Sequence, residues 1–278
     1  MMKNVTKVAL LASALGFVGA LPAMADPFTV NEGVVPGASA NVLTANSMVF
    51  GYNAAISQNA TGGFVENGYL TKSSFNNGVG GSPVNSQLNS LAPTGYGLYG
   101  LFTITGQATG TTGTGVTATF NSISLTLFLD PDQNTSFGFN AANPVGVTTA
   151  GAGEDIAIAN IGPLVSGQAH IFAPPNQANG DFDALANIAL TAFGSTYFTG
   201  PSPFYAFEDL SGNVATIGST PGAADGLPNG GAGAFVAYVT GGGLEIVSGT
   251  TQVPEPASLA LLGAGLIGLG ALRRRSAK

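Results

Sequence analysis

The fold class is decided by the stretch SISLTLFLD, residues 122–130. Ile123, Leu125, Leu127 and Leu129 alternate there with Ser, Thr and Phe. A period of two places the aliphatic side chains on one face of a half-buried β-strand. Working outward from this strand, we expect further strands at residues 42–56, 63–70, 96–107, 155–159, 188–193, 204–207, 235–240 and 244–247.

Turn-forming residues separate these runs. Clusters such as Asn76-Asn77-Gly78 and Asn229-Gly230-Gly231 provide the backbone conformations that loops need. The Gly-rich stretches 106–115 and 241–243 are interpreted as turns as well, because no phosphate-binding G-x-x-x-x-G-K-[ST] motif is present. Many short strands without a βαβ rhythm predict an all-β chain, with a single antiparallel β-sandwich or jelly-roll-like ectodomain.

Residues 181–192 fit two structures. Phe182 and Leu185 have the spacing of a short helix, whereas Ile188 and Leu190 alternate as in a strand. We favour a strand from Asn187, because the sequence that follows is rich in Gly and aromatic residues.

The composition is poor in charge and rich in small and apolar residues. Of 278 residues 45% are hydrophobic and only 8% are charged, with 42 Gly and no Cys. Between Asp26 and Gln252, Lys72 is the one base against thirteen acids, which gives a net charge of −12. Such a segment repels phosphate backbones, so nucleic-acid binding is excluded. The absence of Cys excludes disulfides and thiolate chemistry.

The N-terminus has the three parts of a secretory signal peptide. Lys3 and Lys7 form the basic region, residues 8–21 are apolar, and Ala23-Met24-Ala25 is a cleavage site of the A-x-A type. We expect cleavage after Ala25. An uncleaved anchor is the less favoured alternative, because the apolar run is short for a membrane span.

No set of catalytic residues is evident, so we expect a protein that is not an enzyme. His170 is the only histidine and is interpreted as structural. Close acid pairs, which a glycosidase would need, occur at Asp130/Asp132, Glu154/Asp155, Asp181/Asp183 and Glu208/Asp209. Without knowledge of their spatial arrangement they assign no activity, and no cofactor is expected.

The segment from Asp130 to Thr135 resembles the opening of a calcium loop. Asp130, Asp132 and Asn134 have the required alternation, but Thr135 and Ala141 stand where the loop needs Gly and Glu. We therefore expect a strand that ends in an Asp-Pro turn and no metal site, with calcium at these three residues left open.

The C-terminal 26 residues have a tripartite order. Val253, Pro254, Glu255 and Pro256 come first, an uncharged segment 257–272 follows, and Arg273, Arg274 and Arg275 end it. As a helix, sixteen residues extend about 24 Å, slightly less than a hydrocarbon core of about 30 Å. The arginines indicate the cytoplasmic side.

This tail resembles the PEP-CTERM sorting signal of Gram-negative bacteria. The resemblance implies a transient transmembrane helix, processing by an exosortase, and delivery to the cell surface or the exopolysaccharide matrix. A second resemblance, to flocculation-associated PEP-CTERM proteins, is carried by residues 26–30, 35–38, 84–88, 98–102, 129–132 and 201–207. It implies a role in floc or biofilm formation.

The chain is therefore expected to have a signal peptide (1–25), a β-rich extracellular domain (26–248), a tether (249–252) and a sorting signal (253–278). We expect a non-enzymatic surface or matrix protein whose partners are exosortase and exopolysaccharide or cell-surface glycans. A carbohydrate- or ice-binding module is the alternative, and a secreted hydrolase is a third. Thr residues at 103, 105, 109, 111, 112, 114 and 117 come nearest to an ice-binding array, although they are irregularly spaced.

Overall fold

The computed structural model describes residues 26–78, 80–90, 94–111, 115–140, 146–172, 179–214, 217–218 and 235–249. Helical structure in this part of the chain is limited to a 3-10 turn, η1 (Glu32–Val34), and one short helix, α2 (Gly194–Tyr197). The strands are β1 (Phe28–Asn31), β2 (Val42–Ala45), β3 (Ser47–Gln58), β4 (Gly63–Asn76), β5 (Gly97–Thr111), β6 (Gly115–Asp130), β7 (Ser136–Phe139), β8 (Val147–Ala150), β9 (Ile156–Phe172), β10 (Asn179–Leu190), β11 (Phe198–Gly200), β12 (Phe207–Val214), β13 (Ile217–Gly218) and β14 (Phe235–Gly249).

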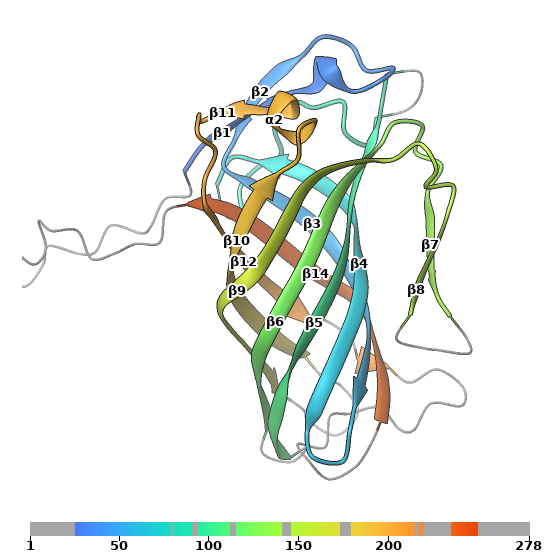
Figure 1. Ribbon diagram of the computed structural model, residues 1–278, viewed down its shortest axis with the longest axis vertical. Coiled ribbons are helices and arrows are strands. Elements are labelled where there is room, and N and C mark those ends of the chain that lie inside the picture. The colour runs from blue at the N-terminus through green and yellow to red at the C-terminus, as the bar shows by residue number, and fades with distance from the viewer. Residues whose placement is uncertain are drawn as a thin grey trace, which may run out of the picture. The chain divides into compact units, whose positions relative to one another are not determined.

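The main sheet closes on itself into a barrel of eight strands (Figure 1). Its order is β3-β4-β5-β6-β9-β10-β12-β14, and β14 pairs with β3 again. All these pairings are antiparallel. The all-β, antiparallel prediction is thus confirmed, whereas the sandwich or jelly roll is wrong. The reason is the pairing of β12 with β14, which joins the two ends of what would otherwise be an open sheet.

Two smaller elements are attached to the barrel. The strands β1, β2 and β11 form a three-stranded sheet that lies with α2 above one barrel end in Figure 1. The β7–β8 hairpin lies between β6 and β9 in the chain, and it is seen beside β4 in the same view.

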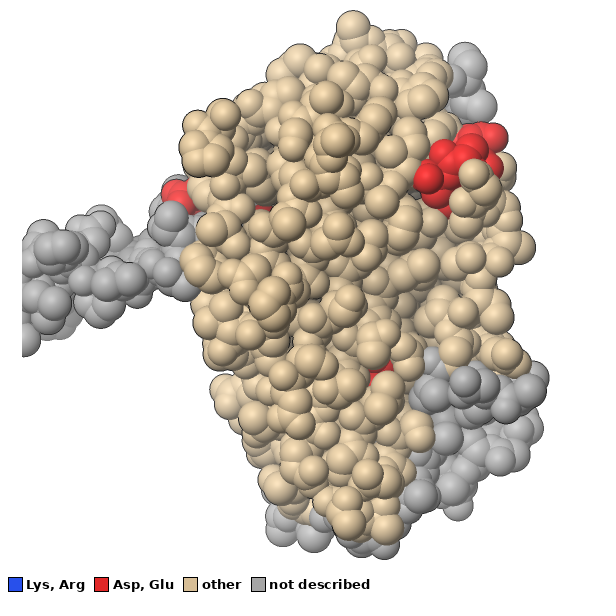
Figure 2. All heavy atoms as spheres, viewed as in Figure 1, with Lys and Arg blue, Asp and Glu red and all other residues tan. Residues whose placement is uncertain are grey.

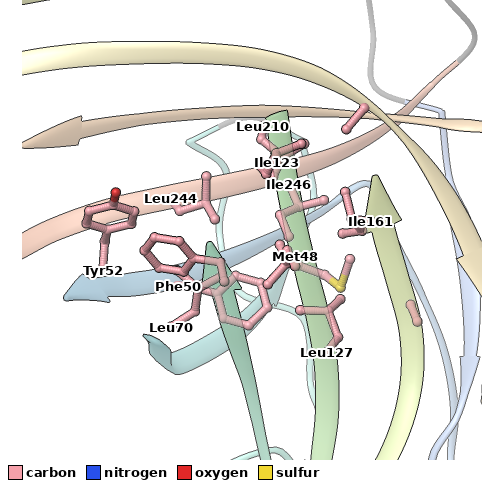
Figure 3. Close-up of a cluster of buried hydrophobic side chains, with 14 of the residues drawn as sticks. Met48, Phe50, Tyr52, Leu70, Ile123, Leu127, Ile161, Leu210, Leu244 and Ile246 are labelled. Atoms are coloured by element: carbon pink, nitrogen blue, oxygen red, sulfur yellow. The ribbon is translucent and has the colours of Figure 1, made fainter. Parts of the chain in front are cut away.

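Alternation along the strands fills the barrel. On β6 the side chains of Ile123, Leu125, Leu127 and Leu129 are all buried, as their spacing predicts. They meet inward side chains from the other strands in one core, which Figure 3 shows for a group that includes Phe50, Leu70, Leu127 and Ile246. The interior is therefore packed with side chains like the core of other small barrels.

Glycines inside the barrel leave room for aromatic rings on neighbouring strands. Phe102 lies directly across from Gly68, and Phe182 across from Gly212. Gly106 has an aromatic neighbour on both sides, Phe64 on β4 and Phe120 on β6. The interpretation of residues 106–115 and 241–243 as turns is thus wrong for Gly106 to Thr111, for Gly115 and for Gly241 to Gly243, which lie within β5, β6 and β14. Small residues opposite large ones allow a narrow barrel to be filled evenly.

The ambiguous segment 181–192 is a strand as far as Leu190. β10 begins at Asn179, eight residues before the expected Asn187, and the helical alternative is wrong. Antiparallel neighbours on both sides, β9 and β12, determine this conformation, and they outweigh the local spacing of Phe182 and Leu185. The expected strand at 204–207 similarly begins only at Phe207 and continues to Val214.

A buried carboxylate organises the barrel end beneath the small sheet. The side chain of Glu32 has no exposed surface. It accepts hydrogen bonds from the hydroxyls of Ser86 and Tyr96 and from the backbone N–H of Gln87, the last at 3.0 Å. The Tyr96 hydroxyl lies 2.7 Å from that of Tyr197 in α2. Such shared bonds offset the cost of burying the carboxylate and join distant segments.

We predict that Gly106→Ala destabilises the protein by about 1–3 kcal/mol, because an added methyl group overpacks the barrel. A Cβ at Gly106 would lie 2.5 Å from the Phe64 ring and closer still to the carbonyl oxygen of Thr119. Gly153→Ala is the matched control, since a Cβ there has no neighbour within 4 Å. Urea unfolding measures both variants, and equal stabilities would contradict the packing argument.

Candidate functional site

The outward face of β5 and β6 carries a group of hydroxyl side chains, bordered by the apolar side chains of Leu101 and Phe128. These two strands, residues 97–111 and 115–130, contain no charged residue before Asp130. Their outward positions carry Thr103, Thr105, Thr119, Ser122, Ser124 and Thr126, which we call the hydroxyl face. Figure 2, seen from the same direction as Figure 1, shows the surface in this region almost free of acidic and basic side chains.

Register brings these hydroxyls together across the strands. Thr103 is paired with Ser124, and Thr105 with Ser122, whose hydroxyl oxygens lie 2.7 Å apart. The Thr126 hydroxyl donates to Asn160 on β9 at 3.0 Å. Each bond fixes one rotamer and leaves further donor or acceptor capacity on the same oxygen.

Two members of the hydroxyl face have no such internal partner. The side chains of Thr119 and Ser124 are exposed, and neither forms a hydrogen bond with another described residue. They are therefore available to a ligand from solution.

Aromatic side chains are used for packing and form no exposed platform. Among residues with described side chains, every Phe and Tyr is buried or half-buried. Tyr69 of β4 stacks on Phe137 of the hairpin at 5.0 Å and 16°, and Tyr99 stacks on Phe128 at 5.1 Å. The Tyr69–Phe137 stack, together with the edge-on contact between Tyr99 and Phe137 at 4.9 Å, attaches the β7–β8 hairpin to the barrel wall.

Three carboxyl groups converge where β6 ends. One oxygen each of Asp130, Glu154 and Asp155 lies within 4.8 Å of the others, although Asp130 is separated from Glu154 by 24 positions. Tyr99 donates its hydroxyl hydrogen to Asp155 at 2.6 Å. Burial, and then this hydrogen bond, raise the pKa of the Tyr99 hydroxyl. Groups this close could hold a divalent cation. They also occur without one, so the spacing alone assigns no ligand.

The three residues at which calcium was left open, Asp130, Asp132 and Asn134, form a turn. The two carboxylate oxygens of Asp130 accept the backbone N–H groups of Asn134 at 3.2 Å and Thr135 at 3.1 Å. The Asn134 amide donates to Asp132 at 3.3 Å. The segment is thus a hydrogen-bonded turn after a strand, as predicted, and the carboxyl groups that cluster with Asp130 are those of Glu154 and Asp155.

The alternation of side chains along β12 places the neighbouring acids Glu208 and Asp209 on opposite faces of the strand. Glu208 is fully buried inside the barrel while Asp209, the next residue, faces outward. Asp209 lies near Asp183 on the neighbouring strand, and partial desolvation and the negative charge of Asp183 raise the pKa of the Asp209 carboxyl.

The single histidine is paired with an acid on the outside of the barrel. His170 Nδ1 lies 3.1 Å from Asp181, its register partner on β10. His170 is half-buried and belongs to β9, where it also faces Thr117 of β6 across the sheet. This placement in a strand supports the structural interpretation of His170.

The barrel interior contains a carboxyl group that sequence reasoning missed. Glu66 is 6% exposed and accepts a hydrogen bond from the Tyr52 hydroxyl. Tyr52 itself stacks on Phe102 at 5.0 Å and packs against Phe182 at 5.4 Å. Desolvation raises the pKa of Glu66 to about 7, although the bond from Tyr52 acts in the opposite direction. The signal was present, since Glu66 alternates with the inward residues Phe64 and Gly68.

The family of the PEP-CTERM protein-sorting motif matches residues 252–275. The chain carries a PEP-CTERM sorting signal. The predicted resemblance of the tail is thereby confirmed, and the matched residues include Val253 to Pro256 and Arg273 to Arg275. The signal means that the protein is sorted by an exosortase, with a membrane-anchored state before processing and a surface-associated state afterwards. No curated protein and no solved structure matches the chain.

Both targeting segments lie outside the described residues. This applies to the predicted cleavage site at Ala23 and Ala25, to the sorting residues Val253–Pro256 and Arg273–Arg275, and to the expected membrane helix at 257–272. In the part of the chain that the structure describes, no helix has the length and apolar character needed to cross a membrane.

We predict that the stability of the barrel decreases between pH 4.5 and about 7 because of Glu66. The unfolded chain loses the Glu66 proton near its ordinary pKa of 4.5, whereas the folded chain retains it up to about pH 7. The folded state therefore binds more protons in this window, and its unfolding free energy falls by on the order of 3 kcal/mol as the pH rises.

Unfolding titrations of the wild type and Glu66→Gln at several pH values test this prediction. Their stability difference should change through the window from pH 4.5 to 7, while the exposed control Asp132→Asn should follow the wild type. Parallel profiles for the wild type and Glu66→Gln would rule out a raised pKa at this position.

Proposed function

We propose that the protein is a non-enzymatic component of the extracellular matrix of a Gram-negative bacterium, and that it contributes to flocculation or biofilm by associating with exopolysaccharide. The observation that carries this proposal is the sorting signal at residues 252–275. A protein delivered by that route reaches the compartment in which cell-surface polysaccharide accumulates.

The surface chemistry of the domain supports this role. Its described aromatic side chains are packed in the interior or in ring stacks, and the outward positions of β5 and β6 carry mostly neutral hydroxyl and amide groups. Such a surface stays hydrated without charge and is chemically similar to a polysaccharide. Among the acids, Glu208 is buried and Asp130 is engaged by backbone N–H groups, which supports a role that is not catalytic.

A carbohydrate-binding module is the second candidate, favoured by the exposed hydroxyls of Thr119 and Ser124. A carbohydrate-binding module needs a defined binding surface, whereas a matrix component could act through its volume and its hydration alone.

We predict that replacing Pro254, Glu255 and Pro256 together by Ala blocks processing of the tail. The variant should be retained in the membrane fraction with an intact mass that includes the C-terminal segment, whereas the wild type should lose it. Glu245→Gln, which changes an acid of β14 outside the signal, serves as the control and should be processed normally. Cleavage of the triple variant at the wild-type rate would contradict the assignment of the motif.

We also predict that deletion of the gene reduces floc formation, and that a plasmid copy of the wild type restores it. The processing-defective variant should fail to restore flocs although it is synthesised. Settling rates of the cultures measure the effect. Flocs of normal size and settling rate in the deletion strain would refute the proposed biological role.

A further inference from the structure

We propose that the hydroxyl face binds a strand of neutral, uncharged polysaccharide. This inference rests on the proposed association with exopolysaccharide, and it specifies both the surface and the chemical class of the polymer. It is supported by the hydrogen-bonding capacity of the face, by the charge of the domain, and by the absence of aromatic and Arg side chains among the residues of the face.

The face presents hydroxyl groups in two dimensions. Neighbouring strands are about 4.8 Å apart, and outward residues two positions apart on one strand are separated by roughly 6.6–6.8 Å. Paired rows such as Thr103/Ser124 and Thr105/Ser122 therefore form a grid with spacings of about 5 and 7 Å. Each hydroxyl can donate one hydrogen bond and accept two, so it can meet sugar hydroxyls in either role.

A polymer can bind this face more tightly than a single sugar, because it can contact several rows of hydroxyl groups at once. One neutral hydrogen bond contributes only about 0.5–1.5 kcal/mol net, which would not hold a monosaccharide. A chain that contacts several rows at once makes its later contacts intramolecularly, and its apparent affinity exceeds that of any single contact. The length of β5 and β6, which have 15 and 16 residues, suits an extended chain better than a small ligand.

Charge determines which polysaccharide fits. Residues 26–252 contain thirteen acids and a single base, Lys72. A polymer of uronic acids or sulfated sugars would be repelled, because the domain has almost no cations to neutralise it. A neutral polymer meets no such barrier, and the hydroxyl face itself contains no carboxylate.

The side chains of the face argue against a protein partner. Protein interfaces obtain most of their binding energy from aromatic and Arg residues in buried pockets. The hydroxyl face contains neither type, and the nearby Tyr69 and Tyr99 are engaged in ring stacks with Phe137 and Phe128.

An ice lattice is also a poor match. The register between β5 and β6 shifts between Thr105 and Gly106, and that between β6 and β9 shifts between Thr119 and Leu125. These irregularities bend a barrel wall that is already curved. A flexible polymer can follow such a surface, whereas a rigid crystal plane requires a flat and regular array.

The test compares the wild type with a variant of the two hydroxyls that lack internal partners, Thr119→Glu with Ser124→Glu. Both positions are exposed, so the variant should retain the melting temperature of the wild type. The control is Thr44→Glu with Thr148→Glu, which adds the same charge at exposed threonines of β2 and β8. The processed protein is recovered from culture and titrated by affinity electrophoresis against dextran, mannan and a soluble cellulose derivative, and against alginate and polygalacturonate.

We expect the wild type and the control to bind at least one neutral polymer and neither acidic polymer. The face variant should bind that neutral polymer about tenfold more weakly, a loss that corresponds to about 1.4 kcal/mol. Equal binding by the face variant and the wild type would overturn the assignment of the surface, while association with polysaccharide would stand.

Preferential binding of alginate or polygalacturonate would overturn the neutral class. Binding to none of the five polymers would overturn this inference, while the deletion phenotype would still test the proposed biological role independently. Thermal hysteresis that the face variant loses would assign the same surface to ice and would likewise refute the inference.

Discussion

Closure of the sheet through β12 and β14 is the constraint on which the rest of the structure depends. Seven register pairs, from Phe207–Gly249 to Asn213–Gly243, join the two ends of the sheet. Once the sheet is closed, the interior volume is limited, and side chains from opposite walls must share it. Gly212 illustrates the requirement, because a Cβ at this position would lie 2.5 Å from the ring of Phe182. The abundant glycine of the chain thus serves packing inside strands as well as turns between them.

Closure of the barrel also gives the two faces of each strand different roles. Inward positions hold apolar and aromatic groups together with the carboxyl groups of Glu66 and Glu208, and Glu66 accepts a hydrogen bond from the Tyr52 hydroxyl. Most outward positions on β5 and β6 are polar, with Leu101 and Phe128 as exceptions, because these positions contribute little to the core. The segments outside the barrel strands have a third role. Residues 26–30, 35–38 and 84–88 belong to the region around Glu32, where they build the end of the barrel.

Much of this could be predicted from the sequence, and the limits have physical causes. Residues 122–130 predicted a strand because the alternation of apolar and polar side chains is visible within one short stretch of sequence. The tail predicted its sorting role because one contiguous run of residues carries the whole sorting signal. The closed barrel could not be distinguished from a sandwich, since β12 and β14 pair across chain segments whose register no local pattern specifies. For the same reason, the approach of Asp130 to Glu154 and Asp155 depends on how the β7–β8 hairpin folds back. The start of β10 at Asn179 was missed because its neighbours on both sides determine it.

Closure also has a consequence for how such molecules could hold cells together. A sheet with open edges can recruit further strands and grow by backbone hydrogen bonding, which is the route to fibrous assemblies. Each of the eight barrel strands already has a neighbour on both sides, so the barrel wall offers no template for such growth, and the open edges in the described part of the chain belong to the short strands β2, β7, β8, β11 and β13. In the proposed role, cohesion between barrels would therefore arise from side chains and from the polymer that they share. A matrix built in this way would remain a reversible, hydrated gel, whose strength is set by the abundance of polysaccharide.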